Sequence, residues 1–209
     1  MSSRIRRLSL QSFSPMIVLA LGMGLGVLFT QHFLSLDSPS QLLPVVQEAP
    51  YPAKACFTPE SHCTPTIVEA INTARTSLYV QAYSFTSAPI ANALVLAKER
   101  GVDVRVILDK SQLTARGSQI PALLEAKIPL FIDQISGIAH NKVMIIDDAL
   151  VLTGSFNFTN AADTRNAENI LWLYDVEIAR LYKSNWERRE KYARAYPEYH
   201  DGFQRAEHQ

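Results

Sequence analysis

The run His140-Asn-Lys142-Val-Met-Ile-Ile-Asp147, followed seven residues later by Gly154-Ser155-Phe-Asn157, is the most informative part of this chain. Residues 143–146 are apolar and mostly β-branched, which predicts a buried strand. Side chains alternate along a strand, so His140 and Lys142 would share one face. Ser155 and Asn157 repeat this spacing on the next extended segment. We therefore expect an imidazole, an ammonium, a hydroxyl and an amide to project together from rigid strands.

Such a set of groups suits a phosphate. A lysine neutralises phosphate charge, a histidine near phosphorus can act as nucleophile or acid, and hydroxyl and amide groups hydrogen-bond to phosphate oxygens. The alternative interpretation is purely structural: a buried strand with a hydrogen-bonded histidine and a lysine whose ammonium reaches solvent. Buried lysines are rare unless they are paired, which favours the functional interpretation.

The pattern His-x-Lys-x4-Asp-x6-Gly-Ser-x-Asn resembles the HKD signature of the phospholipase D superfamily, and every signature position matches. Residues 79–85, 101–109 and 154–169 are also similar to the small single-motif bacterial endonucleases of that superfamily. The resemblance implies a phospholipase D-like α/β/α sandwich with a mixed, mainly parallel sheet and one HKD motif per chain. Larger members carry two motifs, and this chain contains one.

One imidazole cannot attack phosphorus and protonate the leaving oxygen from opposite sides of an in-line displacement. Of the five histidines, only His140 is expected in a core strand. We therefore predict a homodimer in which two His140 side chains face one phosphate across a two-fold axis. The resemblance implies the same arrangement, with a phosphohistidine intermediate that water hydrolyses.

Each candidate catalytic residue has an expected role. His140 attacks in one subunit and acts as general acid in the other. Lys142 and Asn157 bind the non-bridging oxygens, and Ser155 donates a hydrogen bond in the same cluster. Glu168 matches an acidic position that in the family orients the histidine; alternatively, it is a surface carboxylate at a strand start.

Asp147 has the opposite parity to His140 and Lys142, so we expect it to point away from the phosphate and to organise a turn, although it is a signature residue. Neither a metal nor a cofactor is predicted, because paired histidines and lysines would take the place of a metal.

The N-terminal residues differ from the rest. Arg4, Arg6 and Arg7 precede an uncharged apolar stretch over residues 16–30, which is typical of a signal sequence or a membrane anchor. We expect residues 1–31 to be that segment, 32–50 a linker rich in Pro, Ser and Gln, 51–200 the catalytic domain and 201–209 a tail. This organisation predicts export to the bacterial periplasm, with possible attachment to the inner membrane. Secretion and a mitochondrial outer-membrane location are the alternatives.

Cys56 and Cys63 are the two cysteines of the chain. In an oxidising compartment a disulfide that closes this short loop is the expected state. A metal site that also uses His62 is the alternative, but three ligands are one fewer than a structural zinc requires.

Strands and helices alternate along the domain, which predicts an α/β fold. Helices are expected over residues 64–75, 88–100, 118–126 and 175–195, with Thr64 capping the first of them. Besides the strand of the motif, strands are expected over residues 78–85, 102–108, 129–132, 150–154 and 168–173. Tyr79, Tyr83 and Phe85 could stack on bases, but alternating aromatic residues in a strand are more often core.

Three functions fit these features. A sequence-nonspecific endonuclease that cleaves DNA, or RNA, is favoured by the chain-wide resemblance. A phospholipase D or phosphatidyl transferase is the alternative, because a membrane anchor would bring it to lipid. A phosphate-binding module without activity would not require histidine. From residue 51 onward the chain has 17 Lys and Arg against 18 Asp and Glu, so a strongly basic surface, typical of nucleic-acid binding, is missing.

Overall fold

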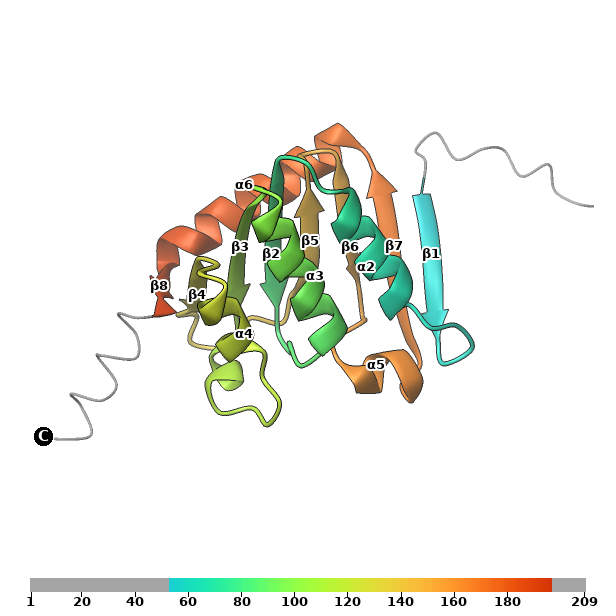
Figure 1. The fold of residues 1–209 in the computed structure, drawn as a ribbon, viewed down its shortest axis with the longest axis horizontal. Helices are drawn as coiled ribbons and strands as arrows, with labels where there is room; N and C mark the ends of the chain where they lie inside the picture. The colour runs from blue at the N-terminus through green and yellow to red at the C-terminus, as the bar shows by residue number, and fades with distance from the viewer. Residues whose placement is uncertain (1–52, 197–209) are drawn as a thin grey trace, which may run out of the picture. The chain divides into compact units, whose positions relative to one another are not determined.

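The computed structural model describes residues 53–196, and Figure 1 shows that they form one twisted sheet flanked by helices. The strands are β1 (Ala53–Thr58), β2 (Ser77–Ala82), β3 (Asp103–Leu108), β4 (Leu130–Asp133), β5 (Lys142–Ile146), β6 (Leu150–Gly154), β7 (Glu168–Tyr174) and β8 (Ala193–Ala195). The helices are α2 (Thr64–Thr73), α3 (Ala88–Glu99), α4 (Ile120–Glu125), α5 (Asn160–Thr164) and α6 (Val176–Tyr192), with a 3₁₀ turn η2 (Lys110–Leu113). The predicted N-terminal segment, linker and tail lie outside the described residues.

The sheet has eight strands in the order β1-β7-β6-β5-β2-β3-β4-β8 and is mixed, as predicted. Parallel pairs do not dominate, however: only β2–β3 and β3–β4 are parallel, and the other five pairs are antiparallel. The expectation of a mainly parallel sheet was therefore wrong. The antiparallel pairs follow from the length of the connections, since a short turn such as the one between β5 and β6 can join only antiparallel neighbours.

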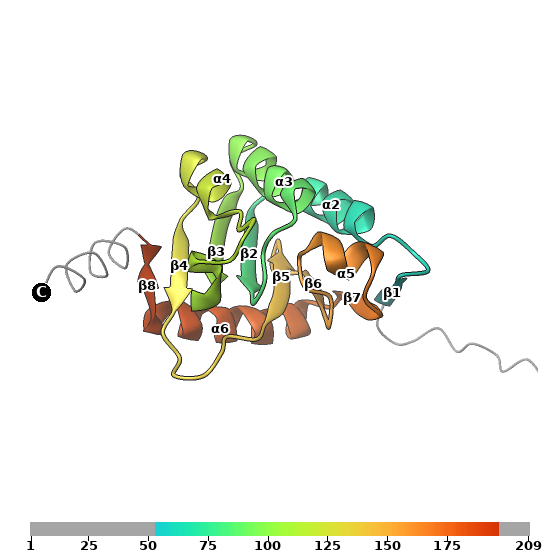
Figure 2. The same cartoon turned by 90° about the horizontal axis from the view of Figure 1, so that it is seen from below.

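Helices cover both faces of the sheet, which confirms the α/β/α sandwich. Figure 2 shows α2, α3 and α4 on one side and α6 alone on the other. The larger hydrophobic core lies on the first side and includes Ile71, Leu94 and Leu123. The smaller core lies under α6 and contains Trp186, which is 1% exposed and donates its indole N–H to the Val80 carbonyl at 3.0 Å.

Several predicted boundaries were wrong: α4 begins at Ile120 rather than at residue 118, and β2 ends at Ala82 rather than at residue 85. Thr64 is the first residue of α2, and the N-cap is Cys63, which makes no side-chain capping hydrogen bond. α6 ends at Tyr192 rather than continuing to residue 195. The next three residues form β8, which pairs antiparallel with β4 at the edge of the sheet. This long-range pairing takes precedence over the helical tendency of the local sequence.

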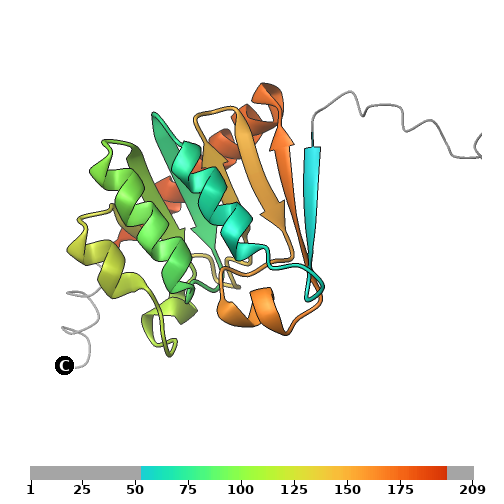
Figure 3. The same ribbon diagram turned by 45° about the vertical axis from the view of Figure 1, so that its right-hand side comes forward.

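The predicted disulfide is present between Cys56 and Cys63. It joins β1, at the other edge of the sheet, to the start of α2, and α5 lies below this edge (Figure 3). The alternative metal site is not formed, because both sulfurs are bonded to each other. Within residues 53–196, no helix is long and apolar enough to cross a membrane.

Candidate active site

His140 and Lys142 lie at the end of the sheet where β5 begins and β6 ends, but the two residues differ in exposure. β5 begins at Lys142, so His140 lies in the preceding loop and not in the strand as predicted. The chain still runs alongside β2 there, because the Tyr83 backbone N–H donates to the Asn141 carbonyl at 2.8 Å. His140 is exposed, whereas Lys142 is 6% exposed. The loop position leaves the imidazole accessible from solvent.

The Lys142 ammonium is buried without a carboxylate partner. Its Nζ donates to the His140 carbonyl at 3.2 Å and lies 5.0 Å from the centre of the Tyr83 ring. None of the ion pairs formed within residues 53–196 involves it. Burial holds the pKa of Lys142 below its ordinary value, although the negative charge of Glu168 opposes this shift. A desolvated cation that no carboxylate neutralises is available to an anionic ligand.

Tyr83 contacts both candidate groups. Its ring centroid lies 4.5 Å from that of His140, with the rings tilted by 59°, and its π-face is near Lys142. Sequence reasoning considered Tyr83 only as a core residue or a base-stacking residue. It was predicted inside a strand over residues 78–85, but β2 ends at Ala82, so Tyr83 directly follows the strand and reaches the site.

Ser155 and Asn157 follow β6 at the same end of the sheet. The Ser155 hydroxyl accepts hydrogen bonds from the backbone N–H of Asn169 at 3.0 Å and from its amide at 3.4 Å. The Asn157 Oδ1 atom is buried and has no hydrogen-bond partner within the described part of the chain. Since rotation of an amide exchanges its oxygen and nitrogen, this position can offer either an acceptor or a donor to a ligand.

Gly154 brings β6 unusually close to β7. A Cβ atom at this position would lie 2.3 Å from the Asn169 carbonyl oxygen, a distance that no side chain tolerates. The Phe156 N–H donates to that same carbonyl at 3.1 Å. The glycine of the motif therefore lets the Ser155 segment pack directly on β7.

Glu168, the first residue of β7, lies at this end of the sheet but makes no hydrogen bond to His140 among the described residues. Its Oε1 accepts from the Asn166 amide at 3.0 Å, and its charge acts on Lys142. The predicted role of Glu168 in orienting the histidine stays a prediction.

Asp147 does not join the cluster. It follows the far end of β5, about 16 Å from Lys142 at roughly 3.3 Å per residue. Its carboxylate accepts hydrogen bonds from the backbone N–H groups of Arg75, Thr76 and Ser77 at 2.9, 2.7 and 3.0 Å. Burial would raise the pKa of Asp147, but these bonds outweigh burial and hold the pKa below its ordinary value. With a φ of 52°, Asp147 organises the β5–β6 turn, as its parity predicted.

Metal-ligand clusters are absent from the described residues: nowhere in 53–196 do three or more His, Cys, Asp or Glu side chains gather closely enough to hold an ion. His62 lies instead beside Asp163, with 3.3 Å between Nδ1 and Oδ2.

Comparison with known proteins places this chain in a family. Residues 67–189 match the family described as "Cardiolipin synthase, PLD-like domain". A protein named phospholipase D from Rickettsia typhi is 42% identical over 178 residues, which is 81% of this chain and 87% of that protein. Its namesake from Rickettsia bellii is 51% identical over 131 residues, or 63% of this chain, and the match spans just under two thirds (65%) of that relative. Mitochondrial cardiolipin hydrolase from Xenopus tropicalis is 38% identical over 66% of this chain and 67% of its own.

The solved structures agree. Nuc from Salmonella typhimurium, a phospholipase D family member, is 38% identical with a TM-score of 0.66, over 70% of this chain and 98% of that one. NucT from Helicobacter pylori is 26% identical with a TM-score of 0.65, over 70% and 99% of the two chains. From the family match and these relatives together, we conclude that this chain belongs to the phospholipase D superfamily.

Proposed function

We propose that this phospholipase D superfamily phosphodiesterase is a metal-independent endonuclease that cleaves DNA, or RNA, through a phosphohistidine. The observation that carries the proposal is the accessible imidazole of His140 beside the buried, unneutralised ammonium of Lys142. A phosphodiester placed there would meet a nucleophile and a positive charge together. The unpaired amide of Asn157 would bind a second phosphate oxygen.

The reaction has two steps in this proposal. A ring nitrogen of His140 bonds to phosphorus while the bond from phosphorus to the leaving oxygen breaks, and a second, protonated imidazole gives that oxygen its proton. Water then attacks the phosphohistidine, loses a proton to the second imidazole and releases the first. Lys142 and Asn157 hold the non-bridging oxygens throughout.

The second imidazole would come from a second copy of the chain. His62, the other histidine of the described residues, lies in the disulfide loop and faces Asp163 of α5. The loop that leads to His140 exposes Ile135 and Ile138, which are 41% and 57% accessible. Exposed apolar side chains beside an incomplete site favour an interface there. We therefore propose a homodimer in which this loop meets its copy across a two-fold axis.

The substrate assignment rests on size as well as on chemistry. An exposed imidazole at the end of the central strands suits a phosphodiester within a polymer or at a lipid surface, since both approach from outside. The chain covers nearly all of the Nuc and NucT structures, which favours the small-endonuclease assignment. The names of the Rickettsia and Xenopus relatives favour phospholipid hydrolysis instead, and that is the second candidate.

The test uses the purified full-length protein in EDTA, with supercoiled plasmid and, separately, with vesicles of phosphatidylcholine and cardiolipin. His140→Asn is the inactive variant and His62→Asn the matched control. Plasmid nicking that persists in EDTA, disappears in His140→Asn and remains in His62→Asn supports the endonuclease. Lipid hydrolysis with intact plasmid would reverse the choice of substrate. Nicking by His140→Asn at the wild-type rate would overturn the proposed nucleophile.

We also propose a periplasmic location, with the N-terminal segment as export signal or anchor to the membrane. The disulfide supports an oxidising compartment. Cell fractionation tests this, and full recovery of the protein with the cytoplasm would contradict it.

A further inference from the structure

A single 3₁₀ turn, η2, together with its N-cap residue Asp109, is hydrogen-bonded both to the chain that precedes His140 and to the chain that follows Tyr83. Two polar side chains at this turn are almost completely buried: Asp109, its N-cap, is 2% exposed, and Gln112 is 3% exposed. Buried polar groups are costly unless they are hydrogen-bonded. The bonds that these two side chains make therefore indicate what they do.

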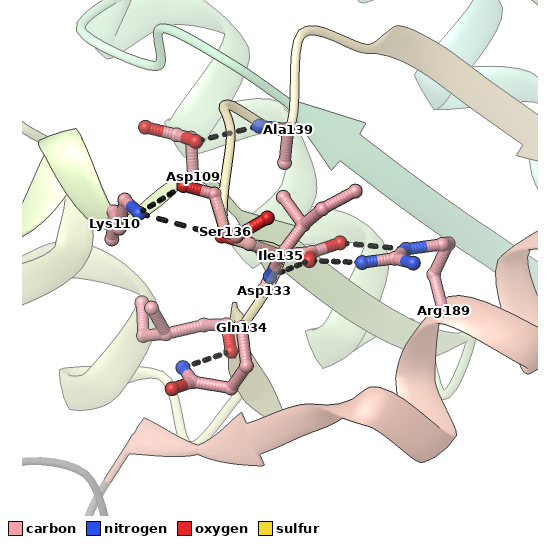
Figure 4. A network of polar contacts seen from close by, with 9 residues as sticks. Asp109, Lys110, Asp133, Gln134, Ile135, Ser136, Ala139 and Arg189 are labelled. Atoms are coloured by element: carbon pink, nitrogen blue, oxygen red, sulfur yellow. Dashed lines mark hydrogen bonds and ion pairs between the residues drawn. The ribbon is translucent and has the colours of Figure 1, made fainter.

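Asp109 fixes the residue that directly precedes His140. Its Oδ2 atom accepts the backbone N–H of Ala139 at 2.7 Å, and its Oδ1 atom accepts that of Ser111 at 2.9 Å. Figure 4 shows the Asp109 carboxylate reaching Ala139. Burial would raise the pKa of Asp109, but the hydrogen bonds from Ser111 and Ala139 outweigh it and hold the pKa below its ordinary value. The carboxylate is ionised at neutral pH, so both of its oxygens accept.

Gln112 holds the chain that follows Tyr83. Its Oε1 atom accepts the backbone N–H of Phe85 at 2.9 Å, and the Phe85 carbonyl accepts the N–H of Gln119 at 3.1 Å. Phe85 lies two residues after Tyr83, whose ring contacts the imidazole. Asp109 and Gln112 thus position the histidine and the tyrosine that packs against it from one rigid turn.

The start of the same loop is held separately. Asp133 forms an ion pair with Arg189 of α6, and Lys110 donates to the carbonyls of Ile135 and Ser136 at 3.3 and 3.4 Å (Figure 4). These contacts lie four or more residues before His140. Among the residues of this network, only Asp109 binds Ala139, the residue next to His140.

We propose that Asp109, supported by Gln112, is a positioning residue for His140, which sets the imidazole against Tyr83 and toward the phosphate. This inference rests on the proposed catalytic function of His140. An aspartate is required because two N–H donors converge on it. Asparagine could accept one of them, but its amide N–H₂ would face the other donor.

The test compares Asp109→Asn and Gln112→Leu with Asp133→Asn, which also removes a buried carboxylate from the network but at the start of the loop. We expect Asp109→Asn to lower kcat by about 10- to 100-fold with KM within about two-fold, because small misplacements of reacting groups cost about that much. Gln112→Leu should act in the same direction.

The second readout is the NMR signal of the His140 imidazole in histidine-labelled full-length protein, assigned by its loss in His140→Asn. The Tyr83 ring current displaces this signal, so it should move in Asp109→Asn and in Gln112→Leu but not in Asp133→Asn. An unmoved signal in Asp109→Asn, or equal changes in Asp133→Asn at the same melting temperature, would overturn the inference. Because the signal needs no substrate, failure of the inference is distinct from failure of the proposed nuclease, which would appear as inactive wild-type protein.

Discussion

Lys142 directs its ammonium to the face of the Tyr83 ring, 5.0 Å from the ring centre, rather than to a carboxylate. A ring face attracts a cation but does not neutralise it. The charge therefore remains available for a ligand, while burial makes its attraction to an anion stronger than in water. This relationship explains how side chains of the protein itself could hold a phosphate.

The first prediction concerns Lys142→Met. We expect activity to fall by about 10²- to 10³-fold, because a group that stabilises transition-state charge is lost. The free energy of unfolding should rise by about 1 kcal/mol at pH 7, because a desolvated charge is replaced by an apolar chain of similar length.

The pH dependence of that gain follows from the lowered pKa of Lys142. Between this pKa and the unfolded value of about 10.4, the unfolded chain binds more protons, so wild-type stability rises with pH. The advantage of Lys142→Met should therefore shrink as pH increases through this window. Urea unfolding at several pH values measures it, with the exposed Lys191→Met as control. A variant less stable than wild type at pH 7 would contradict the prediction.

Tyr83 can be tested by separating its ring from its hydroxyl. Tyr83→Phe keeps the ring against His140 and Lys142, so kcat should stay within about two-fold of wild type. Tyr83→Leu removes the ring, and we expect kcat to fall at least about ten-fold because both groups lose their packing partner. Equal kcat values for the two variants would show that the ring is unimportant.

Gly154→Ala should disrupt the end of β6. The added methyl would collide with the Asn169 carbonyl, and overpacking against backbone typically costs about 1–3 kcal/mol. Gly137→Ala is the matched control, since no atom lies within 4 Å of the corresponding methyl. Thermal unfolding should show a lower melting temperature only for Gly154→Ala. Two unchanged variants would contradict the close approach of β6 and β7.

Asp147→Asn removes a charge while keeping a residue that tolerates the positive φ. The pKa of Asp147 is lower in the folded state, so its contribution is complete above the unfolded value of about 3.9 and is lost as pH falls through the folded pKa. We expect the variant to be about 2 kcal/mol less stable at pH 7, and the difference to shrink below about pH 4. Asp148→Asn, which breaks the surface pair with Lys183, should cost less than about 1 kcal/mol. A constant difference from pH 7 to pH 3 would exclude this explanation.

Ile138→Asp tests the proposed dimer. A charge on the loop that leads to His140 should weaken self-association at least about ten-fold and reduce nicking in parallel. Leu96→Asp, on the exposed face of α3, is the control and should change neither. Analytical ultracentrifugation measures the association. A fully active monomer would remove the need for a shared site.

Local patterns predicted those parts of the fold that depend on neighbouring residues. The β-branched run after Lys142 forms a strand, residues 150–154 form β6 with the expected bounds, and parity correctly turned Asp147 away from the cluster. What the sequence could not supply was long-range pairing. Three residues after α6 become β8 only because β4 has a free edge.

The candidate site shows the same division. The HKD pattern identified His140, Lys142, Ser155 and Asn157, which lie near one end of the sheet. It could not reveal Tyr83 or Asp109, because their contacts cross 57 and 30 residues of chain. Nor could it place His140 outside the strand, since a run of alternating residues does not show where a ladder ends.

The bond between Cys56 and Cys63 also has a mechanical meaning. A pulling force on the chain before Ala53 would otherwise separate β1 from β7 one hydrogen bond at a time. With the sulfurs joined, only the first few residues of β1 can lift away before the load passes covalently to the start of α2. The last residues of β1, which pair with Asn169 and Glu168 of β7, are thus kept from this separation.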